Sequence, residues 1–249
     1  MRIYAGGYGI QSLIAVALFK ALKEMNISAD IVTNGLAGFY AAAEEILGED
    51  EAMRRTMELL DRIDYELYMI ERRWICEGER VKGWKSIAVD HCVKLALQES
   101  FKRWEEIEDL LMGLEENVNV GVEYIDLYGN IGVYYGNGVE VSKISLAMTG
   151  VFPPFKEKFS TTHFTQIPVY TARDGDIVLV NFRDPSKCVF EKADEILSQS
   201  AEIRAIVFAK QLLSKKKVIQ IHHPPMDFKD LADLESIKSN LKKELGELI

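Results

Sequence analysis

The sequence predicts a three-layer α/β/α fold in which helices cover a mostly parallel central sheet. The first forty residues alternate strand, helix, strand and helix, a pattern typical of parallel sheets. Between residues 117 and 141 the apolar residues recur with a period of two, which predicts antiparallel strands beside the parallel ones. The 249 residues contain no internal repeat, low-complexity tract or interdomain linker, so we expect one domain over residues 1–249.

The opening elements follow from local residue preferences. A short apolar run, a turn rich in glycine and a densely apolar stretch predict a strand, a loop and a buried helix. A second strand, a turn and a second helix follow. The expected strands are residues 2–5 and 31–33, and the expected helices are residues 10–25 and 39–47.

Residues 44–114 are predicted to form a helical cap. The stretch 44–74 is charged, and its apolar residues are spaced by three and four, as on one face of a helix: Met53, Met57, Leu60, Ile63 and Leu67. A second helical block is expected over residues 86–114. We interpret the methionine and aromatic positions of both blocks as core packing.

The second half of the chain is predicted to alternate strands and helices. Turns at residues 128–130 and 135–138 are expected to join antiparallel strands. Helices are expected at 142–149, 192–214 and 231–248, and strands at 176–181 and 217–222.

Composition excludes several classes of protein. Hydrophobic residues make up 48% and charged residues 28%, which excludes a disordered or fibrous chain. With 30 Lys and Arg against 39 Asp and Glu, the net charge of −9 argues against a nucleic-acid binder. Cys76, Cys92 and Cys188 lack the spacing of a zinc site or a disulfide framework, which favours a reducing compartment. No segment has the length of a membrane span or the pattern of a signal peptide, so we expect a cytoplasmic protein. We also expect neither a metal nor a cofactor.

Two glycine-containing turns lead from strands into helices. The first, Gly7-Tyr8-Gly9-Ile10-Gln11-Ser12, has the G-x-G-x-x-G form of a dinucleotide fingerprint, with Ser12 at the third glycine. The acidic residue expected at the end of the second strand is missing, because Asp30 precedes that strand. The glycine spacing leaves a nucleotide-binding domain as an alternative interpretation, although this acidic residue is missing.

The second turn, Thr33-Asn34-Gly35-Leu36-Ala37-Gly38, has the small residues of a nucleophile elbow. Asn34 stands in place of a glycine and tolerates positive φ better than most residues do. The central position holds Leu36, whose alkyl side chain cannot attack a carbonyl.

In the order of these motifs the chain resembles the patatin-like phospholipases, serine acyl hydrolases with a Ser-Asp dyad. The first turn is similar to the family's oxyanion loop, with Gly7, Tyr8 and Gly9 in its glycine-rich part and Gln11 at its basic position. The segment from Asn34 through Gly35, Leu36 and Ala37 to Gly38 falls on the elbow. The other matching segments are Gly150-Val151-Phe152-Pro153-Pro154, which resembles the turn before the catalytic aspartate; Ser160-Thr161-Thr162, at the D-G-G position; and residues 218–221 with Pro224-Pro225, similar to the last strand and its proline.

The resemblance implies that the catalytic dyad is lost. Leu36 falls at the position of the nucleophile, and Ser160 at that of the general base. A hydroxyl is a weak nucleophile until a base takes its proton, so a dyad needs both partners. We therefore expect a catalytically deficient protein whose cleft, at the carboxyl ends of the strands, binds a lipid or acyl ligand, or a protein partner.

An active acyl hydrolase with a displaced nucleophile is the alternative within the same family. The candidate nucleophiles are Ser12, Thr33 and Ser160, and His163 is close enough in sequence to pair with Ser160.

The other histidines and a lysine run are interpreted as structural or surface residues. His222 and His223 are adjacent on an expected strand, so we expect them to point to opposite faces and not to share a metal. His91 is given the same interpretation. Lys215-Lys216-Lys217 is expected to be a solvated helix end, with a phosphate or lipid-headgroup contact as the alternative.

Overall fold

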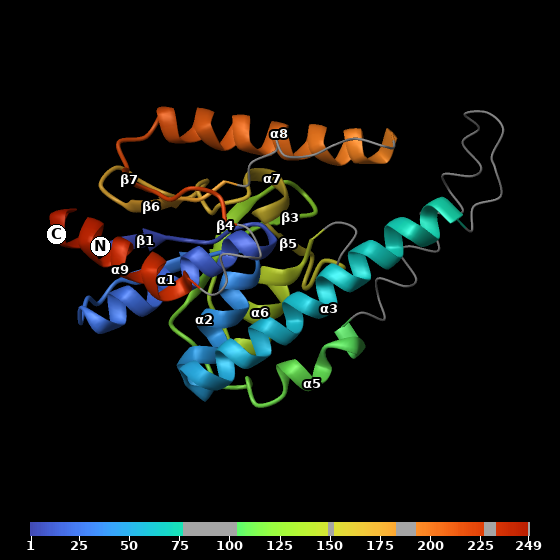
Figure 1. Cartoon of the computed structure of the whole chain (residues 1–249), viewed down its shortest axis with the longest axis horizontal. Helices are drawn as coiled ribbons and strands as arrows, with labels where there is room; N and C mark the ends of the chain where they lie inside the picture. Colours follow the sequence, from blue (N-terminus) through green and yellow to red (C-terminus); the bar gives the residue numbers. More distant parts are fainter. Residues whose placement is uncertain (77–103, 149–151, 183–192, 227–232, 249) are drawn as a thin grey trace.

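The computed structural model describes residues 1–76, 104–148, 152–182, 193–226 and 233–248. These residues form three layers, with a twisted sheet between one long helix, α8 (Ala193–Ser214), and a group of helices on the other side (Figure 1). The predicted three-layer α/β fold with a mostly parallel sheet is therefore confirmed.

The strands of the described residues belong to one seven-stranded sheet. Its order is β4-β3-β2-β1-β6-β7, and β5 also pairs with β3. The pairs β1–β2, β1–β6, β2–β3 and β6–β7 are parallel, whereas β4 and β5 run antiparallel to β3. The strands are β1 (Arg2–Tyr4), β2 (Asp30–Thr33), β3 (Gly121–Asp126), β4 (Ile131–Tyr134), β5 (Lys158–Ser160), β6 (Ile177–Val180) and β7 (Ile219–His222).

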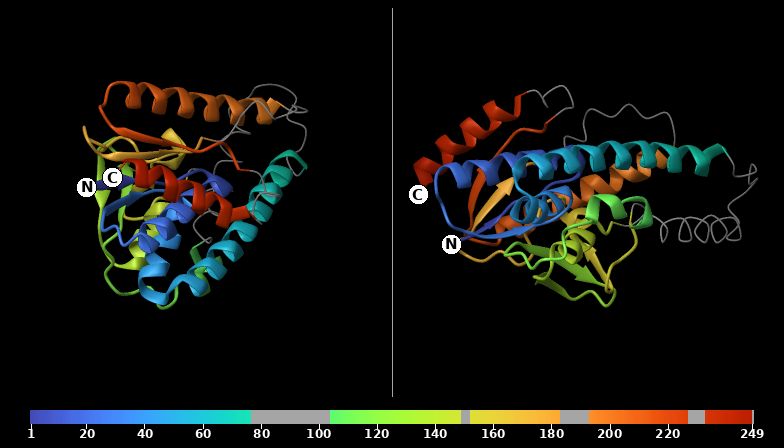
Figure 2. Two further views of the ribbon diagram at one scale, coloured as in Figure 1. Left: turned by 60° about the vertical axis from the view of Figure 1, so that its left-hand side comes forward. Right: turned by 90° about the horizontal axis from the view of Figure 1, so that it is seen from below.

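Helices cover the two faces of the sheet unequally. One face carries α1 (Ser12–Glu24), α2 (Leu36–Leu47), α3 (Glu49–Cys76), α5 (Glu108–Leu111), α6 (Gly138–Leu146) and α9 (Leu234–Leu248). The opposite face carries α7 (Thr162–Thr165) and α8 (Ala193–Ser214) (Figure 2).

Alternating side chains of the strands supply a separate core to each face. On β1, Ile3 packs toward the large helical group, and Tyr4 packs toward α8. On β6, Ile177 packs toward the large helical group, and Val178 packs toward α8. This alternation is the two-residue period of a strand that is buried on both faces.

Most predicted elements lie within a few residues of their expected positions. The hairpin turn at 128–130 is confirmed, because β3 and β4 pair across it. The expected hairpin at 135–138 is wrong. There the Asn137 side chain accepts a hydrogen bond from the Glu140 backbone N–H and caps α6, so Val139 and Val141 belong to a helix.

The expected cap region is described only in part. Residues 77–103, which hold most of its second helical block, lie outside the described residues. In the described part, α3 packs against α2, and its Leu59 and Leu60 are buried. Among the described residues, no helix has the length and apolar character needed to cross a membrane.

Candidate functional site

The candidate site lies at one edge of β3, where pairing with β2 ends and pairing with β5 begins. Thr33, the last residue of β2, pairs with Val122, and further along β3, Tyr124 pairs with Ser160 of β5. Since β4 occupies the other edge of β3, β2 and β5 must share one edge. The end of β5 therefore lies beside the turn that follows β2, although the two are about 125 residues apart in sequence.

The turn after β2 has its strained residue at Gly35. This glycine has φ 62° and ψ −152°, a conformation open essentially to glycine alone. Leu36 begins helix α2, and its side chain is buried in the core cluster of the helical face. The sharp bend of the elbow-like turn thus lies one residue before the position where we expected the nucleophile.

The glycine loop after β1 fills the space in front of this bend. A Cβ atom on Gly35 would lie 2.5 Å from the carbonyl oxygen of Gly7, 3.0 Å from Thr162 Oγ1 and 3.4 Å from Ser12 Oγ. The Ser12 hydroxyl donates a hydrogen bond of 2.8 Å to the same Gly7 oxygen and holds it there. A carbonyl oxygen therefore leaves no room for a side chain at the bend.

A group of buried hydroxyls surrounds the bend. Ser160 Oγ accepts a hydrogen bond from the Gly35 N–H at 3.3 Å and lies 2.8 Å from Thr162 Oγ1. The Ser145 hydroxyl donates to the Gly35 carbonyl oxygen, and Asn34 Nδ2 donates to Thr161 Oγ1 at 3.1 Å. These bonds satisfy the backbone of the turn, so the hydroxyls hold its conformation.

Glu123 is a buried carboxyl beside this group that sequence reasoning missed. Its Oε2 accepts hydrogen bonds from Thr161 Oγ1 and the Val169 N–H, and its Oε1 accepts two from Thr171. Burial outweighs these bonds and raises the pKa of Glu123. The strand pattern of β3 gave no signal, because only the fold brings residues 169–171 over the carboxyl.

The crevice at the carboxyl ends of β1 and β6 is closed by two side-chain amides. The sheet order reverses there, which is where open α/β sheets bind ligands. Asn181 Nδ2 donates to the carbonyl oxygens of Gly6 and Gln11, at 2.8 Å each. The Gln11 amide exchanges two hydrogen bonds with the backbone of Met226.

Of the remaining motif members, those of the second turn are buried, whereas Tyr8 and Gly9 of the first turn are only partly buried. Ala37 and Gly38 lie in α2, where a Cβ on Gly38 would come within 2.1 Å of Ser145 Oγ. Tyr8 precedes the 3-10 turn Gly9–Gln11, and Gly9 has φ 55° with open space around it.

The sequence-predicted histidines do not pair with the hydroxyls. Among the described residues, the hydrogen bonds of Ser160 go to Gly35 and Thr162 and not to His163, whose ring packs edge-on against Phe164. His222 is the last residue of β7, and both His222 and His223 border one groove, so their orientation to opposite faces stays a prediction. His91 lies outside the described residues.

The lysine run is a solvated helix end only in part. Lys215 and Lys217 are exposed, but Lys216 Nζ donates to the carbonyl oxygens of Val169, Tyr170 and Ala172 at 2.6–2.8 Å. Burial lowers the pKa of Lys216. This ammonium group is therefore occupied by the protein's own backbone.

Comparison with known proteins adds no family to this geometry: no protein-family model matches the chain, and no curated protein matches it significantly.

Proposed function

We propose that this protein is a catalytically deficient relative of the patatin-like acyl hydrolases, which binds an acyl or lipid ligand without hydrolysing it. The observation that carries the deficiency is the Gly7 carbonyl oxygen, which lies 2.5 Å from the point that a Cβ on Gly35 would occupy. The ligand class is inferred from the resemblance of the motifs, and of their order, to those of the patatin-like phospholipases.

The chemistry of acyl transfer supports the deficiency. A nucleophile must be exposed on the sharp turn and must have a base within hydrogen-bond reach. The bend here carries no side chain, and Ser160 at its side is fully buried and bonded to backbone and hydroxyl groups. Loss of nucleophile and base typically removes a factor of about 10⁴–10⁶ in rate.

The second candidate is an active hydrolase with a displaced nucleophile. One observation favours it: Thr161 Oγ1 donates to the Glu123 carboxyl at 3.0 Å, and a hydroxyl next to a carboxyl is an arrangement used in acyl transfer. Both side chains are fully buried, and the Asn34 amide also binds the hydroxyl. Ser12 and Thr33 donate their hydroxyl protons to carbonyl oxygens, which cannot act as bases.

The nucleotide-binding interpretation is weakened by the first turn. Its Ser12 side chain bonds to Gly7 inside the loop, and Gln11 is buried and bonded to Met226. The side chains of Ser12 and Gln11 are therefore both bonded within the protein.

The test uses the purified full chain with a fluorophosphonate probe, p-nitrophenyl esters and phospholipid vesicles. We expect no covalent label and no ester hydrolysis above the buffer rate. Turnover that disappears in Thr161→Val would contradict the proposal and support the second candidate. Thr56→Val is the matched control, because it removes a buried hydroxyl on α3, away from the turn.

A further inference from the structure

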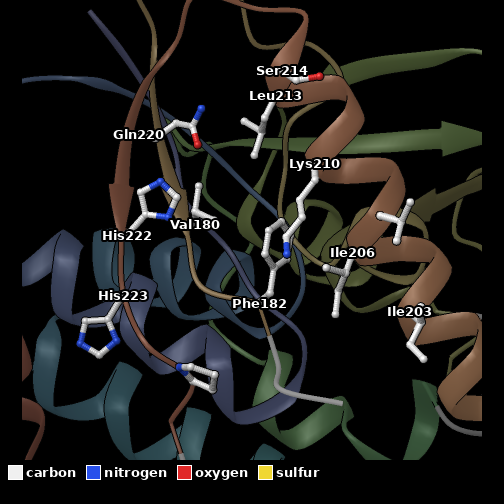
Figure 3. A pocket seen from close by; sticks show the side chains of 12 residues that line it. Val180, Phe182, Ile203, Ile206, Lys210, Leu213, Ser214, Gln220, His222 and His223 are labelled. Atoms are coloured by element: carbon white, nitrogen blue, oxygen red, sulfur yellow. The ribbon is translucent and has the colours of Figure 1, made fainter. Parts of the chain in front are cut away.

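A groove of about 850 Å³ lies between α8 and the strands β6 and β7 (Figure 3). It is on the face of the sheet opposite to α1 and α2, and it is separate from the elbow-like turn. The lining residues are Val180, Phe182, Ile203, Ile206, Val207, Lys210, Leu213, Ser214, Gln220, His222, His223 and Pro225.

The wall formed by α8 is apolar and open. Ile203 is 44% exposed and Val207 is 48% exposed, so both present apolar surface to the groove. Ile206 and Leu213 are buried behind them. From Ile203 to Leu213 the helix rises about 15 Å, so this wall is elongated and suits a chain-like ligand.

The opposite wall mixes apolar side chains with side chains of β7 and its end that carry nitrogen atoms. Gln220 and His222 alternate on β7 and both border the groove, and His223 follows at the end of the strand. Figure 3 shows Lys210 reaching from α8 toward Phe182, between the two walls. Its Nζ lies 5.9 Å from the centre of the Phe182 ring.

The charge of the groove is opposite to that of the chain. The whole chain has a net charge of −9, yet none of the twelve lining residues is acidic. In the part of the chain that the structure describes, no carboxylate forms a salt bridge with Lys210. A lysine ammonium and imidazole N–H groups are the donors that a carboxylate accepts from.

We propose that this groove binds a long-chain fatty acid. Its alkyl chain lies along Ile203, Val207 and Phe182, and its carboxylate lies between Lys210 and His222. The volume is in the range of small-ligand sites, which bury an apolar body and fix it with few polar groups. The inference rests on the acyl-ligand part of the proposed function and gives that ligand a place away from the closed turn.

The experiment is a fluorescence or calorimetric titration of the full chain with lauric or palmitic acid below its micelle concentration. Lys210→Met removes the charge and keeps the length of the side chain; Val207→Asp puts a carboxylate on the apolar wall. We expect each variant to weaken binding by about tenfold, and we expect the methyl ester of the same acid to lose a similar factor. Circular dichroism checks that each variant is folded.

Matched controls carry the same changes outside the groove. Lys215→Met lies just beyond the end of α8, and Ile219→Asp lies on β7 but not in the lining; both are expected to bind as the unmodified protein does. A fatty acid with a photoreactive alkyl group, followed by mass spectrometry, is expected to label α8 or β7.

The outcomes separate the two proposals. Equal affinity of all variants, or labelling of residues around Gly35, overturns the groove assignment and leaves the acyl-ligand function standing. No binding of either acid to the unmodified protein overturns both.

Discussion

The carbonyl oxygen of Gly7 lies 2.5 Å from the point that a Cβ atom on Gly35 would occupy. The two residues belong to separate turns, each leading from a parallel strand into a helix. The Ser12 hydroxyl fixes the oxygen, and the hydroxyls of Ser145 and Ser160 bind the backbone of Gly35. The elbow-like turn is thus closed by the glycine loop that faces it.

Placing a serine at the bend is predicted to destabilise the protein and not to create a hydrolase. Gly35→Ser adds a side chain in a strained backbone conformation and against the Gly7 oxygen, which together cost at least about 2 kcal/mol of unfolding free energy. Urea denaturation measures the loss.

Gly48→Ser is the control for backbone strain. Gly48 also has positive φ, at 87°, but its added Cβ would meet no atom within 4 Å. We expect Gly48→Ser to cost less than Gly35→Ser. Equal costs would show that contact with Gly7 does not matter.

Ser160 is predicted to act on stability. Ser160→Ala leaves the buried Gly35 N–H without its acceptor and is expected to cost about 1–3 kcal/mol of unfolding free energy. Ser214→Ala, at an exposed serine bonded within α8, is the control and is expected to change little. A Ser160→Ala protein that is as stable as the unmodified one would argue against the hydroxyl network as the support of the turn.

Glu123 is predicted to make stability fall as pH rises. Burial raises the pKa of Glu123 in the folded protein, so the folded state binds this proton more tightly than the unfolded state does. The contribution is fully present below the unfolded pKa of about 4.3 and is lost as pH rises through the folded pKa, by at most about 1.4 kcal/mol per pH unit. Urea denaturation at several pH values measures it.

The variant Glu123→Gln isolates this effect, because glutamine does not titrate. The unfolding free energy of the unmodified protein, minus that of the variant, is expected to decrease as pH rises above about 4.3. The exposed Glu116 serves as a control through Glu116→Gln. A difference that stays constant or grows with pH would contradict the raised pKa.

Lys216 is predicted to hold residues 169–172 in place. Lys216→Met keeps the length of the side chain but leaves three carbonyl oxygens without their donor, at a cost of about 2 kcal/mol. Lys215→Met, at its exposed neighbour, is expected to stay within about 0.5 kcal/mol.

Hydrogen exchange tests the same contact locally. The N–H groups of Val169 and Thr171 donate to Glu123, so loosening of this segment speeds their exchange. Unchanged exchange at both residues in Lys216→Met would show that the lysine does not hold the segment.

The closeness of Ser160 to the turn at residues 34–38 could be expected from the order of the motifs, whereas its function in the turn could not. The sequence placed Ser160 beside the elbow through a resemblance, and the pairing of β5 with β3 brings it to Gly35. The bend itself falls at Gly35 and not at Leu36, since backbone dihedrals depend on what packs against the turn. Glu123 shows the same limit: its burial depends on a segment about forty-six residues later in the chain.

By itself, the sequence determined the class of the fold and most of its elements, because apolar periodicity, glycine turns and helix caps act over a few residues. It also determined that no reactive oxygen stands inside the turn at residues 34–38, since that depends only on residue identity. The tertiary structure alone decided that a carbonyl oxygen leaves no room for a side chain at the bend, that Lys216 and Glu123 are engaged with distant backbone, and that Lys210 and His222 line one groove. These relations join segments far apart in the chain, and only packing in three dimensions brings their atoms within contact distance.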